Sequence, residues 1–154
     1  MNLMESNMYE IVKMKKEQLC QVEEISKEEF QNTTWSNKQF EKEIENSFVC
    51  IFETKIVGFL CLQLAGDDMT ILNIAVSNNF KRKKIATRFL QQAKEIAKEN
   101  NIINIFLEVE TNNIPALSFY KKNGFKVLRT RNNYYKDGTS CVEMKLNLLK
   151  NSQF

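Results

Sequence analysis

The stretch NIAVSNNFKRKKIATRFLQQAKEIAK, Asn73–Lys98, decides the fold of this chain. It begins as the end of a β-rich segment, passes through a basic loop and continues as a helix whose apolar residues recur on one face. A nearly continuous apolar segment follows at Ile102–Val109, as expected of a strand that is covered on both faces. Strand, helix and strand in this order predict a right-handed βαβ crossover that joins a parallel pair of strands.

On the N-terminal side, three β-rich runs separated by short gaps predict an antiparallel meander: Phe48–Phe52, Ile56–Leu64 and Met69–Val76. An amphipathic helix is expected at Lys15–Glu29, and Ser36 with Gln39 forms a capping box that predicts a second helix. On the C-terminal side we expect a helix at Ile114–Asn123 and strands at Phe125–Thr130 and Cys141–Leu148. These elements predict an α/β fold with a mixed sheet and flanking helices.

The composition limits the classes of function. A chain of 154 residues with 43% hydrophobic residues suits one domain, which we expect to span 1–154 with a core at about 8–149. Because histidine is absent, Ser-His-Asp and Cys-His nucleophiles are excluded, and no metal is expected. The net charge of +3 does not indicate a polyanion binder. With no apolar run long enough to span a bilayer, we expect a cytoplasmic protein without a membrane partner.

The loop Lys81–Lys84 feeds directly into the N-terminus of the predicted helix. The free N–H groups of a first helical turn attract anions, and flanking Lys and Arg side chains add Coulomb attraction. A pyrophosphate would fit this site. The alternatives are a solvated basic cluster and a nucleic-acid patch. Since the charge is confined to one turn and no aromatic residues are interleaved with it, the small anion is favoured and nucleic acid is not an expected partner.

The residues around this loop resemble the acetyl-CoA-binding segment of GCN5-related N-acetyltransferases (GNAT). Asn73–Val76 is followed by Lys81-x-x-Lys84-x-Ala86, where the family loop usually reads Gln/Arg-x-x-Gly-x-Gly/Ala. Further motifs resemble the branch that acetylates the N-terminal alanine of a ribosomal protein: Trp35-Ser36, Leu107-Glu108-Val109, Asn113, Tyr120, Gly124-Phe125 and Asn133-Tyr134-Tyr135. The resemblance covers residues from roughly 10 to 148. Lysine at position 84 departs from the family glycine, whereas Ala86 keeps the second small residue.

The resemblance implies a GNAT-like fold with a mostly antiparallel sheet, and acetyl-CoA as co-substrate. The implied cofactor-binding residues are Ile74, Ala75, Val76, Arg82, Lys83, Lys84, Ile85, Ala86, Thr87 and Asn113. The strand ending at Val76 is expected to carry a bulge and to splay from its parallel neighbour, which frees backbone N–H groups for the thioester carbonyl. The alternative for Asn113 is an ordinary helix N-cap.

Glu108 lies at the C-terminal end of an apolar strand, which is the end at which open α/β sheets place their sites. The resemblance makes it the candidate catalytic base. Glu110 is its rival, because residues two apart on a strand share a face, and the alternative for either is a solvated surface group. The resemblance gives Tyr120 the role of acid toward the departing thiolate; otherwise it is a packing aromatic. Trp35, Tyr134 and Tyr135 would shape the acceptor site.

Three hypotheses follow. The first is acetyl transfer from acetyl-CoA to a protein N-terminal amine, with a ribosomal protein as the partner. The second keeps the fold and the co-substrate but changes the acceptor to a small amine or a lysine. The third is a non-catalytic module that senses CoA or binds nucleic acid.

Overall fold

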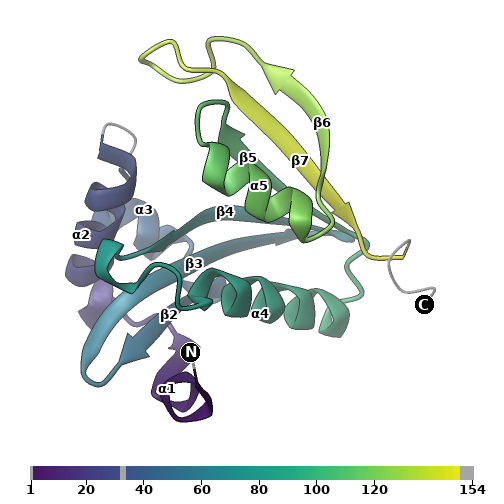
Figure 1. Ribbon diagram of the computed structural model, residues 1–154. Coiled ribbons are helices and arrows are strands. Elements are labelled where there is room, and N and C mark those ends of the chain that lie inside the picture. The colour runs from purple at the N-terminus through teal and green to yellow at the C-terminus, as the bar shows by residue number, and fades with distance from the viewer. Residues whose placement is uncertain (1, 32–33, 150–154) are drawn as a thin grey trace. The chain divides into compact units, whose positions relative to one another are not determined.

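The computed structural model describes residues 2–31 and 34–149. Its helices are α1 (Leu3–Asn7), α2 (Leu19–Phe30), α3 (Asn37–Lys42), α4 (Ile85–Glu99) and α5 (Ile114–Lys122), and its strands are β1 (Tyr9–Lys13), β2 (Ser47–Phe52), β3 (Lys55–Ala65), β4 (Asp68–Val76), β5 (Asn104–Glu110), β6 (Lys126–Arg131) and β7 (Cys141–Asn147) (Figure 1). Short 3₁₀ turns occur at Lys16–Gln18, Ile44–Asn46 and Asn78–Phe80. Within the described ranges, none of the helices has the length and apolar character that crossing a bilayer requires.

The strands form one seven-stranded sheet with the order β1-β2-β3-β4-β5-β7-β6. β1 pairs antiparallel with β2, β2 with β3, β5 with β7 and β6 with β7. β4 and β5 are parallel, with register pairs from Asp68–Asn104 to Thr70–Phe106, and α4 lies between them in the chain. The predicted α/β class, the mixed and mostly antiparallel sheet and the βαβ crossover are confirmed. A bulge in β4 and its splay from β5 stay predictions.

The chain forms two compact units. Unit 1 comprises Met1–Gln63 and Asn73–Glu95, and unit 2 comprises Leu64–Leu72 and Ile96–Phe154. Unit 1 therefore contains the basic loop with most of α4, and unit 2 contains β5, α5 and the hairpin of β6 and β7.

In the core of unit 1, α4 packs closely against the sheet at Gly58 of β3. Phe89 and Ala93, one turn apart on α4, are fully buried. A Cβ atom at Gly58 of β3 would lie 2.9 Å from the Ala75 carbonyl oxygen of β4 and 3.1 Å from the Phe89 ring. Glycine is therefore the residue that lets the end of β4 and the first turns of α4 pack together, and this packing positions the loop that joins them.

Two helices of unit 1 show how local sequence sets helix starts. At α3 the predicted capping box is present: the Ser36 hydroxyl accepts from the Gln39 N–H, and the Gln39 side chain accepts from the Ser36 N–H. The predicted helix at Lys15–Glu29 differs in its first turn. The Gln18 side chain accepts from the Lys15 N–H at 2.8 Å and closes a 3₁₀ turn, so the α-helix begins only at Leu19.

β1 was not predicted from the sequence. This strand is five residues long and pairs antiparallel with β2, from Tyr9–Phe52 to Lys13–Phe48. The rings of Tyr9 and Phe52 lie 4.7 Å apart, which adds a side-chain contact to the first of these pairs.

In unit 2, β5 is shorter than the predicted Ile102–Val109 strand and is buried on one face. Ile105, Leu107 and Val109 are buried, whereas Glu108 between them is exposed. The prediction of a strand covered on both faces was therefore wrong at Glu108. The segment before β5 is a connection whose Ile103 N–H donates to the Asp67 carbonyl at 2.7 Å. After α5, Gly124 adopts a φ of +92° and ends the helix at the predicted place.

Candidate functional site

The loop between β4 and α4 is held at its start by two carboxylates from the C-terminal part of α2. Glu28 accepts from the Ser77 hydroxyl at 3.4 Å and from the Asn78 N–H at 3.2 Å. Glu29 pairs with Lys81, with 2.7 Å between the carboxylate oxygen and Nζ. The first cation of the basic loop is therefore engaged by the protein itself, and the positive charges at Arg82, Lys83 and Lys84 follow it.

The backbone of this loop alternates in handedness. Arg82 has a φ of +64° and Lys84 a φ of +60°, while Lys83 between them is not in the left-handed region. Alternation of this kind turns successive N–H groups to the same side and forms an anion-binding concavity. The first intrahelical bond of α4 runs from the Arg88 N–H to the Lys84 carbonyl at 3.1 Å.

The N–H groups of residues 85–87 precede the first bond of α4, at the end where the helix dipole favours negative charge. Ile85 is buried and anchors this turn, whereas Ala86 and Thr87 are half-buried. The donors, the dipole and the adjacent basic side chains suit a pyrophosphate.

The other predicted residues of unit 1 lie on β4 and after α2. Ala75 is buried, and its neighbours Ile74 and Val76 are half-buried. Trp35 is half-buried, and its ring lies 5.3 Å from the Phe40 ring of α3.

In unit 2, Glu108 lies on β5 with a side chain that is 35% exposed. The Arg131 Nη1 atom at the end of β6 approaches its carboxylate to 3.8 Å. A hydrogen bond with this carboxylate raises the pKa of Tyr134, whose hydroxyl is the donor. The carboxylate thus has one cationic and one hydroxyl partner, both from the hairpin of β6 and β7, and its remaining exposure leaves it accessible to water.

Tyr134 and Tyr135 lie in the connection between β6 and β7, with their rings 5.1 Å apart in an edge-to-face arrangement. A turn orders them: the Tyr135 N–H donates to the Thr139 carbonyl at 3.0 Å, and the Gly138 N–H donates to the Tyr135 carbonyl at 2.9 Å. Tyr134 is 44% exposed, and Tyr135 is half-buried. Burial raises the pKa of Tyr135, which is therefore neutral at pH 7. The structure brings three predicted residues together here: Glu108, Tyr134 and Tyr135.

Tyr120 of α5 is 6% exposed and packs against two aromatic rings, with centroid distances of 5.2 Å to Phe119 and 5.5 Å to Phe125. Burial raises the pKa of its hydroxyl, so the phenol keeps its proton across the physiological range. It is thus a packing residue that also retains a proton to donate.

Asn113 is the N-cap of α5. Its Oδ1 atom accepts from the Ala116 N–H at 3.2 Å, which is the alternative that the sequence left open. The capping bond occupies Oδ1 and leaves the cofactor role of Asn113 a prediction.

A charged cluster lies beside Glu108 and was not predicted from the sequence. Glu143 of β7 accepts from Arg129 Nε at 2.6 Å and from Arg131 Nη2 at 3.3 Å. The hydrogen bond from Arg129 holds the pKa of Glu143 below its usual range. The signal in the sequence was Arg129 and Arg131 spaced two apart, which puts both on one strand face, but their partner depends on the register of the hairpin.

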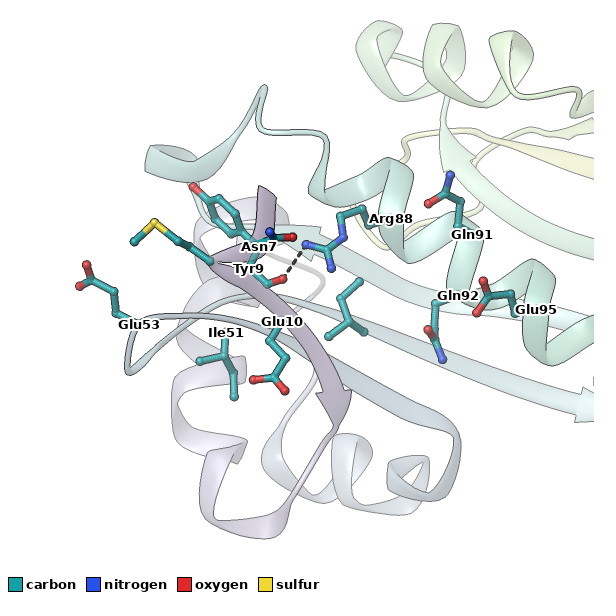
Figure 2. Close-up of a pocket in the computed structure, with 11 residues that line it drawn as sticks. Asn7, Tyr9, Glu10, Ile51, Glu53, Arg88, Gln91, Gln92 and Glu95 are labelled. Carbon is teal, nitrogen blue, oxygen red and sulfur yellow. Dashed lines mark hydrogen bonds between the residues drawn. The ribbon is translucent and has the colours of Figure 1, made fainter. Parts of the chain in front are cut away.

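A separate hollow of about 640 Å³ lies in unit 1 between β1 and α4 (Figure 2). Arg88 reaches from α4 and donates to the Tyr9 carbonyl at 2.6 Å, which gives a backbone acceptor of the edge strand a side-chain partner. None of the predicted site residues lines this hollow. In the part of the chain that the structure describes, no group of three or more Cys, Asp or Glu side chains is placed to hold a metal ion.

The model of the acetyltransferase (GNAT) family matches residues 9–125. The chain belongs to this family. Enzymes of the GNAT family transfer the acetyl group of acetyl-CoA to an amine, and this GNAT chain is an acetyl-CoA-dependent N-acetyltransferase. The helix N-terminus and the basic loop of unit 1 fit the pyrophosphate of that co-substrate.

Two relatives and one solved structure are similar to this GNAT chain. It is 30% identical over 129 residues to the putative [ribosomal protein bS18]-alanine N-acetyltransferase of Bacillus subtilis. This alignment covers 80% of this chain and 85% of the relative. It is 31% identical over 110 residues to an N-alpha-acetyltransferase of Saccharolobus solfataricus, covering 63% of this chain and 66% of that one. The crystal structure of the ribosomal-protein-S18-alanine N-acetyltransferase of Escherichia coli aligns with a TM-score of 0.83 at 25% identity, over 92% of this chain and 94% of the other.

Proposed function

We propose that this chain acetylates the α-amino group of protein N-termini, and that the N-terminal alanine of a ribosomal protein is its acceptor. The names of the Bacillus and Saccharolobus relatives support the N-terminal amine, and the first of these supports the ribosomal protein. We take residues 1–154 as one cytoplasmic N-acetyltransferase domain with its core at about 8–149.

The observation that carries this proposal is the environment of Glu108. Its carboxylate is partly exposed and is flanked by Arg131 and by the hydroxyl of Tyr134. An amine must lose a proton before it attacks a thioester. At pH 7 this costs about 1.4 kcal/mol for an α-amino group with a pKa near 8, but about 4.6 kcal/mol for a lysine near 10.4. A single carboxylate that works through water suits the first of these tasks.

In the proposed mechanism Glu108 takes, through a water molecule, the proton that turns the acceptor ammonium into an amine. The C–N bond then forms, the C–S bond breaks and its electron pair leaves with sulfur. Tyr120 gives its proton to that sulfur and is reprotonated by water, while the second proton of the nitrogen goes to solvent. The exchange releases one proton in total. Burial suits Tyr120 to this role, because its raised pKa keeps the phenol protonated until the thiolate forms.

The co-substrate would be held by the end of β4 at Ile74–Val76 and by the loop and first turn of α4 at residues 82–87. Trp35, Tyr134 and Tyr135 would bind the acceptor, with the exposed Tyr134 facing the peptide. Asn113 is kept as a secondary contact, because its Oδ1 atom is already used by the helix cap.

The roles of Glu108 and Tyr120 are tested by steady-state kinetics on Glu108→Gln and Tyr120→Phe. Each substitution is expected to lower kcat by about 10²–10⁴-fold, the usual contribution of a general acid or base. Glu110→Gln is the matched control: it removes a carboxylate two residues along the same strand and is expected to change kcat by less than about threefold. A loss below about tenfold for both Glu108→Gln and Tyr120→Phe contradicts the mechanism.

The acceptor is tested by competition between a peptide that begins with alanine, a lysine peptide whose N-terminus is blocked, and a polyamine. The alanine peptide is expected to have the highest kcat/KM. Higher turnover of the polyamine or of the lysine peptide would transfer the proposal to that acceptor. Membership of the acetyltransferase family sets aside the third, non-catalytic hypothesis.

A further inference from the structure

A row of charges crosses three neighbouring strands of unit 2. Glu108 of β5 is the register partner of Glu143 on β7, and Glu143 is the register partner of Arg129 on β6. Two carboxylates are therefore directly opposite each other. Like charges in this position destabilise a strand pair and make it harder to ionise either group. A cation placed between the two carboxylates offsets this repulsion.

A bulge in β6 supplies this cation. The register of β6 with β7 shifts between Val127 and Arg129, so that Leu128 has no partner and Arg129 takes the position opposite Glu143. Without this extra residue, the side chains that follow it would point to the other face of the sheet. The bulge thus places Arg129 and Arg131 on the face of the two carboxylates.

The two arginines are not equivalent. Arg129 Nε contacts Glu143 at 2.6 Å, whereas Arg131 contacts Glu143 at 3.3 Å through Nη2 and Glu108 at 3.8 Å through Nη1. The Arg131 guanidinium also lies 5.5 Å from the centre of the Tyr134 ring, whose hydroxyl is bonded to Glu108. Arg131 is therefore the group that joins both carboxylates and the tyrosine.

We propose that Arg131 is a positioning residue for catalysis, which bridges Glu143 and Glu108, offsets the charge of Glu143 and holds the Glu108 carboxylate beside Tyr134. This inference rests on the proposed role of Glu108 as the base.

The other ionisable groups of unit 2 near Glu108 do not replace Arg131. Glu110 on the same strand is a further carboxyl group. Arg129 is paired with Glu143, and the charge of Glu108 is the smallest of the effects on its pKa. Burial raises the pKa of Tyr135 and of Cys141, so both are neutral at pH 7.

The direct test is a carboxyl-carbon NMR titration of the full chain with labelled glutamate, in which Glu108 is assigned by its absence from the Glu108→Gln spectrum. Arg131→Gln is expected to move the midpoint of the Glu108 titration up by about 0.5–1 pH unit, an ion-pair effect reduced by solvent exposure. Glu143→Gln is expected to move the midpoint down by a similar amount. The double variant Arg131→Gln/Glu143→Gln should return to within about 0.3 units of the wild type, and Arg131→Lys, which keeps the charge, should stay near the wild type.

Arg129→Gln is the matched control, because it removes the same charge from the same strand but not a contact with Glu108. It is expected to shift the midpoint by less than half as much as Arg131→Gln. Equal shifts for the two arginines, or no shift for Arg131→Gln, would overturn the positioning role. The acid limb of kcat/KM against pH should move with the NMR midpoint, while the plateau kcat of Arg131→Lys stays within about threefold of the wild type.

The titration is independent of the role of Glu108 in the reaction. An acid limb that persists in Glu108→Gln would overturn Glu108 as the base even where the NMR midpoints move as expected. Conversely, loss of activity in Glu108→Gln together with an unmoved titration in Arg131→Gln would keep the base and reject the positioning residue.

Discussion

Replacing Lys84 by glycine is expected to stabilise this protein. Lys84 has a φ of +60°, and a residue with a Cβ pays about 1–2 kcal/mol for the left-handed region. Glycine removes this cost, but it also increases the conformational entropy of the unfolded chain, which favours unfolding by about 0.4–1 kcal/mol. The net gain in the free energy of unfolding is about 0.5–1 kcal/mol, which for a chain of this size raises Tm by roughly 2–3 °C.

Two variants separate backbone strain from charge. Lys83→Gly removes the same charge from the same loop, but Lys83 is not in the left-handed region. Its substitution is therefore expected only to lower the free energy of unfolding, by about 0.4–1 kcal/mol, because glycine has more freedom in the unfolded chain. Lys84→Ala removes the charge and keeps the strain, so its stability should equal that of the wild type within about 0.5 kcal/mol. Urea unfolding in one buffer should therefore rank the proteins as Lys84→Gly, then wild type and Lys84→Ala, then Lys83→Gly. A Lys84→Gly protein that is no more stable than Lys83→Gly refutes the strain argument.

The remaining predictions concern a helix cap and two buried thiols. Asn113→Ala should lower the free energy of unfolding by about 1 kcal/mol, while Asn113→Asp keeps the cap and stays within a few tenths; a KM for acetyl-CoA raised more than tenfold in the alanine variant alone would show a cofactor role as well. Burial raises the pKa of Cys50 to about 11 and of Cys61 to about 12, so the folded state holds protons that the unfolded chain loses above pH 8.5–9. The free energy of unfolding therefore keeps its full value below pH 8.5. Above pH 8.5 it decreases by about 1.4 kcal/mol per pH unit for each thiol. Cys50→Ala should remove one such slope between pH 9 and 11 in urea unfolding, and an unchanged slope would contradict the account.

The parts of the fold that the sequence predicted are those whose signals are local. The capping bonds of Ser36 and Gln39 involve neighbours three apart, and the apolar spacing of α4 needs only one helix face. β1 was missed because it is only five residues long and pairs with a strand far away in the sequence. Tyr9 of β1, for example, is paired with Phe52 of β2. Such a short strand is defined by its distant partner more than by its own pattern.

The site divides in the same way. The basic loop was predicted because a run of cations before a helix is visible in the sequence, and Glu108 was proposed through its resemblance to a motif. The cluster of Arg129, Arg131 and Glu143 could not be predicted, because a bulge at Leu128 decides which face the arginines occupy. For Asn113 the sequence allowed a cap or a cofactor contact. The hydrogen bond to Ala116 shows the cap, and the cofactor contact stays a prediction.

The side chain of Lys84 is expected to affect the affinity for acetyl-CoA in two ways, compared with a glycine at this position. Glycine there would relieve the backbone and let a phosphate approach without a side chain in the way, but it would also remove a positive charge next to the helix N-terminus. The two effects on the affinity for acetyl-CoA are opposite, and ionic strength separates them, because salt screens the charge and leaves the steric effect unchanged. If lysine is kept for its charge, the affinity of the wild type should fall more steeply with salt than that of Lys84→Gly, and the two curves should converge or cross at high salt. Parallel curves would mean that the ammonium group does not reach the phosphates, and the strain at Lys84 would then bring no gain in binding.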